Sequence, residues 1–197
     1  MDERIRAFVA ADLAVATLRR IAEAQVGMRR AAEAKGFRVS WVDPSRMHVT
    51  LKFLGDVRME LIPAIGERIE RALHGRRPFE VESAGAGAFP SAEKPRVLWA
   101  GLRDGEAMND LAHAVEGAMV ELGFAAEERS FHAHVTLGRV KEAPGPADFL
   151  AEFRETGFGR SSITDVVVYQ STLNSKGPEY RPLLRVPLAG REGNHGG

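Results

Sequence analysis

The tetrapeptide HVTL occurs twice, at His48–Leu51 in the run MHVTLKFLG and at His134–Leu137 in the run FHAHVTLGRV. In both runs β-branched and apolar residues alternate with polar ones and a glycine follows, which is typical of a strand. Residues i and i+2 of a strand share a face, so histidine and threonine point one way and valine and leucine the other. The repeat therefore predicts two strands that bury an apolar pair and turn an imidazole and a hydroxyl towards a cleft.

The composition is that of an ordinary globular protein. Of its 197 residues, 44% are hydrophobic and 27% are charged, which suffices for a real core. Lys+Arg and Asp+Glu both number 27, so no global basic field exists to hold a long nucleic acid, and any such contact should be local. Cysteine is absent, which excludes disulfides, thiol catalysis and cysteine metal sites. With no signal peptide and no long apolar run, we expect a cytoplasmic monomer that does not enter a membrane.

Strands are expected to outnumber helices along the chain, and several strands are joined by short loops. Helical spacing of apolar residues predicts helices at residues 13–34, 58–74 and 105–122, with a short one at 148–155. The first motif strand is expected to end at Gly55, and the second to span residues 131–140. Further strands are predicted at residues 4–10, 37–42, 79–84, 96–102, 162–173 and 180–188. This order favours an α+β fold with helices on the outer faces of antiparallel sheets.

The repeat indicates two similar lobes. We expect a bilobal fold in which two antiparallel sheets are related by pseudo-two-fold symmetry and flank a central cleft. Residues 1–190 would form this single two-lobed domain. The segment REGNHGG, residues 191–197, has no apolar anchor and is predicted to be a disordered tail.

Two histidines that flank one small space can act as a base and an acid, because the pKa of a free imidazole is about 6.5. Such a pair suits in-line displacement at phosphorus: the base activates a water and the acid protonates the oxygen that leaves. For His48 and His134, the hydroxyls of Thr50 and Thr136 can donate to the phosphoryl oxygens, and Arg139 can add charge-assisted donors. This chemistry needs no metal and no other cofactor.

Phe53 and Arg139 each lie five residues after their motif histidine. Phe53 is a possible substrate-binding residue that could stack on a base or fill the core. An odd offset puts both residues on the wrong face of a regular strand, although Gly138 could host a bulge that re-aims Arg139. Lys52, four residues after His48, is expected on the face of that histidine and is a second possible substrate-binding residue.

Other interpretations of the histidines stay open. A strand histidine is more often structural than catalytic, and shared ancestry of two lobes could repeat a motif of purely structural meaning. His132 shares the face of His134, and a His-x-His pair can bind a metal. Only Glu127 and Glu128 stand out as a third ligand, so we expect no metal site.

Beyond the two motifs, other segments resemble a known family. The paired HVTL motifs are similar to those of the two-histidine phosphoesterase superfamily, and within it the chain resembles the RNA 2′,3′-cyclic phosphodiesterases, also called 2′-5′ RNA ligases. The resemblance covers nearly the whole chain. It includes RAFVA at 6–10, WV at 41–42, HVTLKFLG, PRVLW at 95–99, HVTLGR, and YQSTL at 169–173 with Gly177 and Tyr180 after it.

The resemblance implies metal-independent opening of a 2′,3′-cyclic phosphate to a 2′-phosphate, on RNA ends or nucleotides. It implies that His48 gives a proton to the leaving 3′ oxygen and that His134 takes one from the attacking water. Thr50, Thr136 and Arg139 would hold the phosphate. The same site could instead join RNA ends through a 2′-5′ link, or bind RNA ends without catalysis. Many members have Arg-Pro where this chain has His-Ala before the second motif, which leaves its substrate preference open.

Overall fold

The computed structural model describes residues 3–103, 105–174 and 177–190 of the chain. The expected tail at 191–197 lies outside the described residues. In chain order the elements are β1 (Arg4–Ala11), α1 (Val15–Ala34), β2 (Arg38–Trp41), η1 (Pro44–Arg46), β3 (Val49–Arg58), η2 (Met59–Leu61), α2 (Ile62–Leu73), β4 (Phe79–Phe89), β5 (Val97–Arg103), α3 (Glu106–Glu121), β6 (His134–Glu142), η3 (Asp148–Phe153), β7 (Gly157–Ile163), β8 (Asp165–Asn174) and β9 (Gly177–Pro187).

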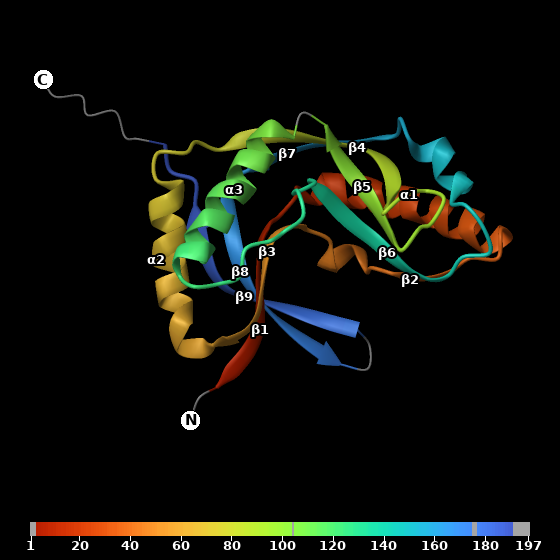
Figure 1. Ribbon diagram of the computed structural model, residues 1–197. Coiled ribbons are helices and arrows are strands. Elements are labelled where there is room, and N and C mark those ends of the chain that lie inside the picture. Colours follow the sequence, from red (N-terminus) through yellow and green to blue (C-terminus); the bar gives the residue numbers. More distant parts are fainter. Residues whose placement is uncertain (1–2, 104, 175–176, 191–197) are drawn as a thin grey trace, which may run out of the picture.

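The strands pair antiparallel in the order β7-β4-β5-β6-β3-β1-β8-β9, and β2 pairs with β6 (Figure 1). The two motif strands, β3 and β6, stand side by side at the centre of this order. Val49 and Val135 form the pair that joins them. The α+β class and its antiparallel pairing are as expected. The expectation of two separate sheets is wrong, because the valines of the two motifs pair and join the strands into one continuous sheet.

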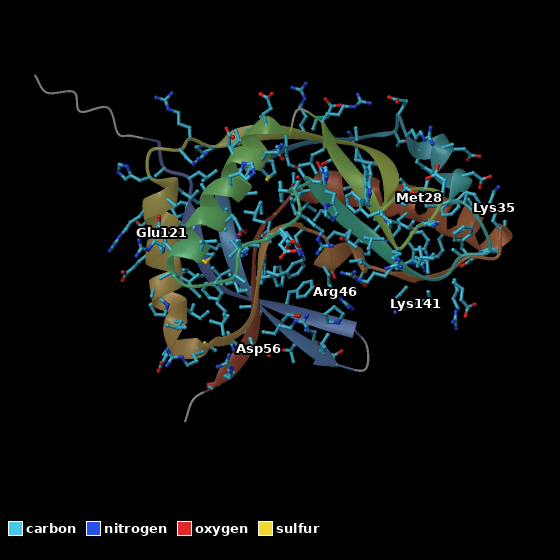
Figure 2. All side chains as sticks on the ribbon, viewed as in Figure 1. Met28, Lys35, Arg46, Asp56, Glu121 and Lys141 are labelled. Carbon is cyan, nitrogen blue, oxygen red and sulfur yellow. The ribbon has the colours of Figure 1, made fainter. Side chains whose placement is uncertain are left out.

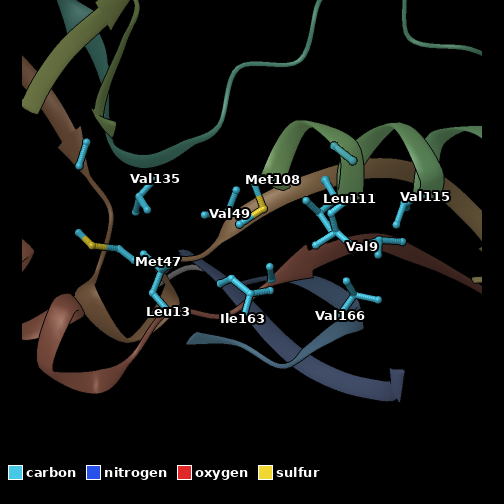
Figure 3. Close-up of a cluster of buried hydrophobic side chains, with 14 of the residues drawn as sticks. Val9, Leu13, Met47, Val49, Met108, Leu111, Val115, Val135, Ile163 and Val166 are labelled. Atoms are coloured by element: carbon cyan, nitrogen blue, oxygen red, sulfur yellow. The ribbon is translucent and has the colours of Figure 1, made fainter. Parts of the chain in front are cut away.

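Helices cover both halves of the sheet. α2 and α3 pack together against the half that contains β1, β3, β8 and β9, whereas α1 packs along β7 and β2 in the other half (Figure 1). α3 lies over the junction of the motif strands, where Val49 and Val135 are buried near Met108 and Leu111 (Figure 3). The three long helices that the apolar spacing predicts are present. None of the helices in the described residues is both long and apolar enough to cross a membrane.

Two expected strands depart furthest from the observed bounds. Residues 162–173 were expected to form one strand, but the chain divides at Thr164, because β7 pairs with β4 at one end of the sheet and β8 with β1 in the other half. β4 continues through the Gly85–Gly87 segment to Phe89 instead of stopping at Ala84. A register shift falls between Ser83 and Ala86, and Gly85 takes a positive φ of 73° there, which glycine tolerates at little cost.

Candidate functional site

The two motif strands bring four polar side chains to the face of the sheet opposite the buried valines. Val49 and Val135 are both 0% exposed, and the histidines and threonines beside them are only partly buried. This alternation confirms what the HVTL pattern predicts. In the antiparallel register set by Val49 and Val135, His48 comes opposite Thr136, and Thr50 comes opposite His134. The two imidazoles are close enough that the charge of His134 lowers the pKa of His48.

Each imidazole is oriented by a backbone carbonyl two residues before it. Nδ1 of His48 lies 2.9 Å from the Arg46 carbonyl oxygen, and Nδ1 of His134 lies 2.7 Å from that of His132. A carbonyl only accepts, so Nδ1 donates in both rings and Nε2 is left to take or give a proton. Nε2 of His48 lies 3.0 Å from Oγ1 of Thr50, whose hydroxyl donates to it when the ring is neutral. Both histidines thus present the same nitrogen for chemistry.

A wall of aromatic rings surrounds His48. Its ring stacks on Phe8 at 4.8 Å between centroids and meets the edge of Tyr180 at 5.3 Å. Tyr169 lies 5.4 Å from the ring of Phe8 and 6.2 Å from that of His48, and its hydroxyl donates to the Asp12 carboxylate at 2.9 Å. These contacts hold the His48 ring in place.

Burial lowers the pKa of both motif histidines below its ordinary value. For His48, the hydrogen bond to the carbonyl and the charge of Asp12 act in the opposite direction. For His134, the charges of His132 and Arg139 add to the effect of burial, while the carbonyl hydrogen bond opposes it. Both rings therefore favour the neutral form in the free protein, and a bound anion would favour protonation of either.

A β-bulge follows the threonine in both motif strands. In β3 the extra residue is Leu51, because consecutive residues of β1 pair with the threonine and with Lys52. In β6 it is Leu137, because consecutive residues of β5 pair with the threonine and with Gly138. Each bulge shifts the alternation by one residue. The fifth position after each histidine therefore returns to the histidine face, and the fourth position leaves it.

The bulge in β3 puts Phe53 and Lys52 each on the face opposite to the one it would have in a regular strand. Phe53 pairs with Phe8, lies 6.3 Å from its ring and is 65% exposed, so its face is open to a ligand. Lys52 is only 7% exposed and points towards α3, where its ammonium donates to Glu116 at 2.8 Å and to the Ala125 carbonyl at 2.6 Å. The expectation that Lys52 shares the histidine face fails because the bulge turns it into the core.

Arg139 lies on the histidine face, as a bulge requires. It is exposed, forms no ion pair within the described residues, and is close enough to lower the pKa of His134. Arg139, Arg46 and Arg6 also oppose the increase that burial causes in the pKa of Tyr180. Figure 2 shows Arg46 between η1 and the ends of β8 and β9. The charges of three guanidinium groups therefore act on the part of the site that contains Tyr180.

The surroundings of His134 differ from those of His48. Phe89 meets the His134 ring edge-on at 5.0 Å and lies 5.3 Å from Trp99, which pairs with Thr136. Next to these rings a hollow of about 300 Å³ opens against His134. Sequence patterns gave no sign of it.

His132 is exposed, and its ring lies 5.9 Å from that of Phe89. Across residues 3–103, 105–174 and 177–190, no group of three or more His, Cys, Asp or Glu side chains lies close enough together to hold a metal. The alternative of a metal site at His132 and His134 therefore finds no third ligand in that part of the chain.

Residue patterns alone missed Phe8, Asp12 and Tyr180. Only the segments RAFVA and YQSTL with Tyr180, which carry the family resemblance, pointed to two of them. The aromatic contacts around His48 join β1 to β8 and β9, and no local sequence pattern encodes contacts between such distant segments.

The chain matches the family described as LigT-like phosphoesterase at residues 13–99 and 102–180. It is 37% identical to the RNA 2′,3′-cyclic phosphodiesterase of Archaeoglobus fulgidus over 146 residues, which are 74% of this chain and 81% of the relative. It is 33% identical to that of Methanothermobacter thermautotrophicus over 183 residues, 90% of this chain and 95% of the relative.

Solved structures share the fold. TT0787 of Thermus thermophilus superimposes with a TM-score of 0.78 at 28% identity, covering 95% of this chain and 100% of that one. Escherichia coli LigT complexed with 3′-AMP superimposes with a TM-score of 0.75 at 26% identity, covering 95% and 99%. By sequence and by fold, this chain belongs to the LigT-like phosphoesterase family.

Proposed function

We propose that this protein is an RNA 2′,3′-cyclic phosphodiesterase that opens the cyclic phosphate of RNA ends or nucleotides to a 2′-phosphate. The observation that carries the proposal is that both imidazoles lie at the β3–β6 junction, each with Nδ1 bound to a carbonyl and Nε2 left for proton transfer. The relatives named RNA 2′,3′-cyclic phosphodiesterase support the substrate class.

In the proposed reaction a water attacks phosphorus in line with the 3′ oxygen. His134 takes the water proton at Nε2 as the new P–O bond forms. His48 gives its Nε2 proton to the 3′ oxygen as the P–O3′ bond breaks. The products are a 2′-phosphate and a 3′-hydroxyl, and solvent returns the two histidines to their starting states. Acid–base catalysis of this kind contributes about 10²–10⁴-fold per group.

Thr50, Thr136 and Arg139 are proposed to hold the non-bridging oxygens. Charge-assisted hydrogen bonds to a phosphoryl group are stronger than neutral ones, and an arginine can make two at once. The guanidinium groups of Arg46 and Arg6 add positive charge near Tyr180, where negative charge on the phosphate would be stabilised.

Phe53 is proposed to stack on the base of the nucleotide that carries the cyclic phosphate. Its exposed ring lies on the His48 side, beside Phe8. The ribose that carries the leaving 3′ oxygen must lie on the same side, next to the proton donor. An exposed aromatic ring can contribute about 1–3 kcal/mol to binding one base by stacking.

We also propose that the halves of the sheet are lobes related by a pseudo-two-fold axis near Val49 and Val135. The strand order is β6-β5-β4-β7 on one side of the junction and β3-β1-β8-β9 on the other. Both motif strands also carry a bulge at the leucine of the HVTL motif, Leu51 in β3 and Leu137 in β6. Residues 1–190 would then be one two-lobed domain, acting in the cytoplasm as a monomer.

The test is incubation with adenosine 2′,3′-cyclic phosphate in EDTA, with products resolved by chromatography. Adenosine 2′-phosphate should form with the unmodified protein and fall sharply with His48→Ala or His134→Ala. His113→Ala, an exposed histidine on α3, is the matched control and should leave the rate unchanged. Binding without turnover would favour the RNA-end binder, and formation of the 3′-phosphate would reverse the proposed leaving group.

A further inference from the structure

A cluster of three charged side chains is attached to the aromatic wall around His48. The Asp12 carboxylate, directly after β1, accepts hydrogen bonds at 2.9 Å from the Tyr169 hydroxyl and at 3.1 Å from Arg185 of β9. Through its other terminal nitrogen, Arg185 donates to Asp165 at 2.9 Å. One guanidinium therefore links two carboxylates, and one of these carboxylates is bound to a ring of the wall.

The ion pairs of this cluster are too exposed to add much stability. The side chains of Arg185, Asp12 and Asp165 are 52%, 38% and 26% exposed. Such pairs contribute little to folding, because water screens the charges and ordering long side chains costs entropy. What the cluster does to the neighbouring imidazole therefore matters more than what it adds to stability.

The cluster reaches His48 through the ring of Tyr169. That ring lies 6.2 Å from the imidazole at an angle of 26°, and 5.4 Å from Phe8, on which the imidazole stacks. Because Asp12 holds the phenol at its hydroxyl, the ring cannot swing away from the imidazole without losing that bond. Burial lowers the pKa of His48, and the charge of Asp12 acts against that decrease. The carboxylate thus both orients the wall and favours a protonated His48.

The charges that act on His134 have the opposite sign. Burial lowers the pKa of His134, and the charges of His132 and Arg139 lower it further. A carboxylate favours the protonated form of an imidazole, and a cation favours the neutral form. Two groups whose surroundings differ in this way are suited to the roles of acid and base. The two HVTL motifs are identical, so this difference comes from residues outside them.

Other titratable and charged groups face His48 from the elements packed against it. Tyr180 of β9 meets the ring edge-on at 5.3 Å, and the charge of His134 on β6 adds to the decrease that burial causes in the pKa of His48. The charged groups that act on Tyr180 are all guanidinium groups, those of Arg139, Arg46 and Arg6. Asp12 therefore supplies the negative charge that favours a proton on His48, against a surplus of positive charge.

We propose that Asp12 and Arg185 are positioning residues for the proton donor, an inference that rests on the proposed function. Asp12, joined to the wall through Tyr169, makes His48 the acid of the pair. Arg185 carries the opposite charge at the same carboxylate and limits how strongly Asp12 acts. Burial raises the pKa of Tyr169, and there the charge of Asp12 adds to the increase whereas that of Arg185 opposes it.

The test combines two measurements on matched variants. Arg185→Gln removes the cation, Arg185→Lys keeps it, and Arg181→Gln is the control, because Arg181 is an exposed arginine on the same strand. NMR titration of the free protein follows the pKa of each motif histidine, with assignments from His48→Ala and His134→Ala. The same variants are assayed for kcat/KM against pH on adenosine 2′,3′-cyclic phosphate.

Arg185→Gln should raise the pKa of His48, because Asp12 is then unopposed and favours the protonated imidazole more strongly. The alkaline limb of kcat/KM, where the donor loses its proton, should move to higher pH by about 0.2–0.7 pH unit, the effect of one exposed charge pair. Asp12→Asn should move both readouts the other way. The double variant Asp12→Asn/Arg185→Gln should return close to the unmodified protein, and Arg185→Lys should stay there.

The acid limb, where His134 gains a proton, should change least in all of these variants. A fall of kcat/KM at every pH with both limbs in place would indicate a merely structural role and overturn the proposal. An equal movement in Arg181→Gln, or a pKa of His48 that stays unchanged in Arg185→Gln, would overturn it too and leave the proposed function standing. Movement of the acid limb in place of the alkaline one would also overturn it. Absence of hydrolysis by the unmodified protein would overturn the proposed function and, with it, the role of His48 as a donor.

Discussion

Val49 of β3 pairs with Val135 of β6, and a motif histidine immediately precedes each valine. Because the strands are antiparallel, this one contact sets each histidine across from the threonine of the other copy. Both valines are fully buried under α3, so the spacing of the two imidazoles is set by the core and not by a mobile loop.

Replacing either motif histidine should abolish most of the turnover. We expect kcat for a 2′,3′-cyclic nucleotide to fall about 10²–10⁴-fold in His48→Ala and in His134→Ala. The double variant should be little worse than either single one, because the two groups act in one step. Single-turnover assays in EDTA measure this. A loss that multiplies in the double variant would mean that the two rings act independently.

The pH dependence of kcat/KM follows from the lowered pKa of both rings. His134 must be neutral to accept a proton, so its lowered pKa extends activity towards acid. His48 must be protonated to donate, so its lowered pKa brings the alkaline decline to lower pH. The plot of kcat/KM against pH should therefore be bell-shaped, with its maximum below about pH 6.5, the ordinary pKa of histidine.

Asp12→Asn separates the two limbs of that profile. The charge of Asp12 raises the pKa of His48 and is not among the influences on His134. Its removal should move the alkaline limb to still lower pH and leave the acid limb in place. An equal shift of both limbs in the measured kcat/KM profile would contradict the assignment of donor and acceptor.

Arg139→Ala should lower kcat/KM by about tenfold to a hundredfold, which corresponds to the loss of about 1.5–3 kcal/mol in hydrogen bonds to a charged group. Arg139→Lys should recover only part of this, since an ammonium cannot bind two oxygens as a planar guanidinium does. Lys141→Ala, an exposed cation on the same strand, controls for general charge. Equal effects of Arg139→Ala and Lys141→Ala would mean that Arg139 acts only through long-range attraction.

Lys52→Met should affect stability and not catalysis. It leaves Glu116 without its partner in a largely buried pair, for which we expect a loss of about 2–4 kcal/mol in the free energy of unfolding. Lys52→Met combined with Glu116→Gln should recover part of that loss. Denaturant melts measure both. An unchanged free energy of unfolding together with a large fall in kcat/KM would restore Lys52 as a substrate-binding residue.

Local patterns predicted the strands of the motif, its buried valines and leucines, and the three long helices. They failed at Lys52 and left Phe53 on the wrong face, and they suggested a bulge at Gly138 where the structure has it at Leu137. The bulges at Leu51 and Leu137 are defined only by pairing with β1 and β5. Strict alternation breaks at a bulge, and only the partner strand reveals which residue is extra.

The hollow escaped sequence analysis for a similar reason. Gly101 lies in an expected strand and Gly87 lies beyond the expected end of another, and a glycine has no side chain whose direction could be inferred. Their effect on the hollow depends on Trp99, which lies across Gly87 on the neighbouring strand. The space left between side chains depends on how the strands pack in the folded protein, so no single residue in the sequence indicates it.

The aromatic wall has a consequence for how the protein is made. His48 leaves the ribosome long before Tyr169 and Tyr180, and β8 and β9 must be synthesised before they can pack on Phe8. A nascent chain that ends before β8 has its first histidine but nothing to hold that ring in position. Such unfinished chains should be inert towards cellular RNA, and reactivity should begin only when the last two strands dock.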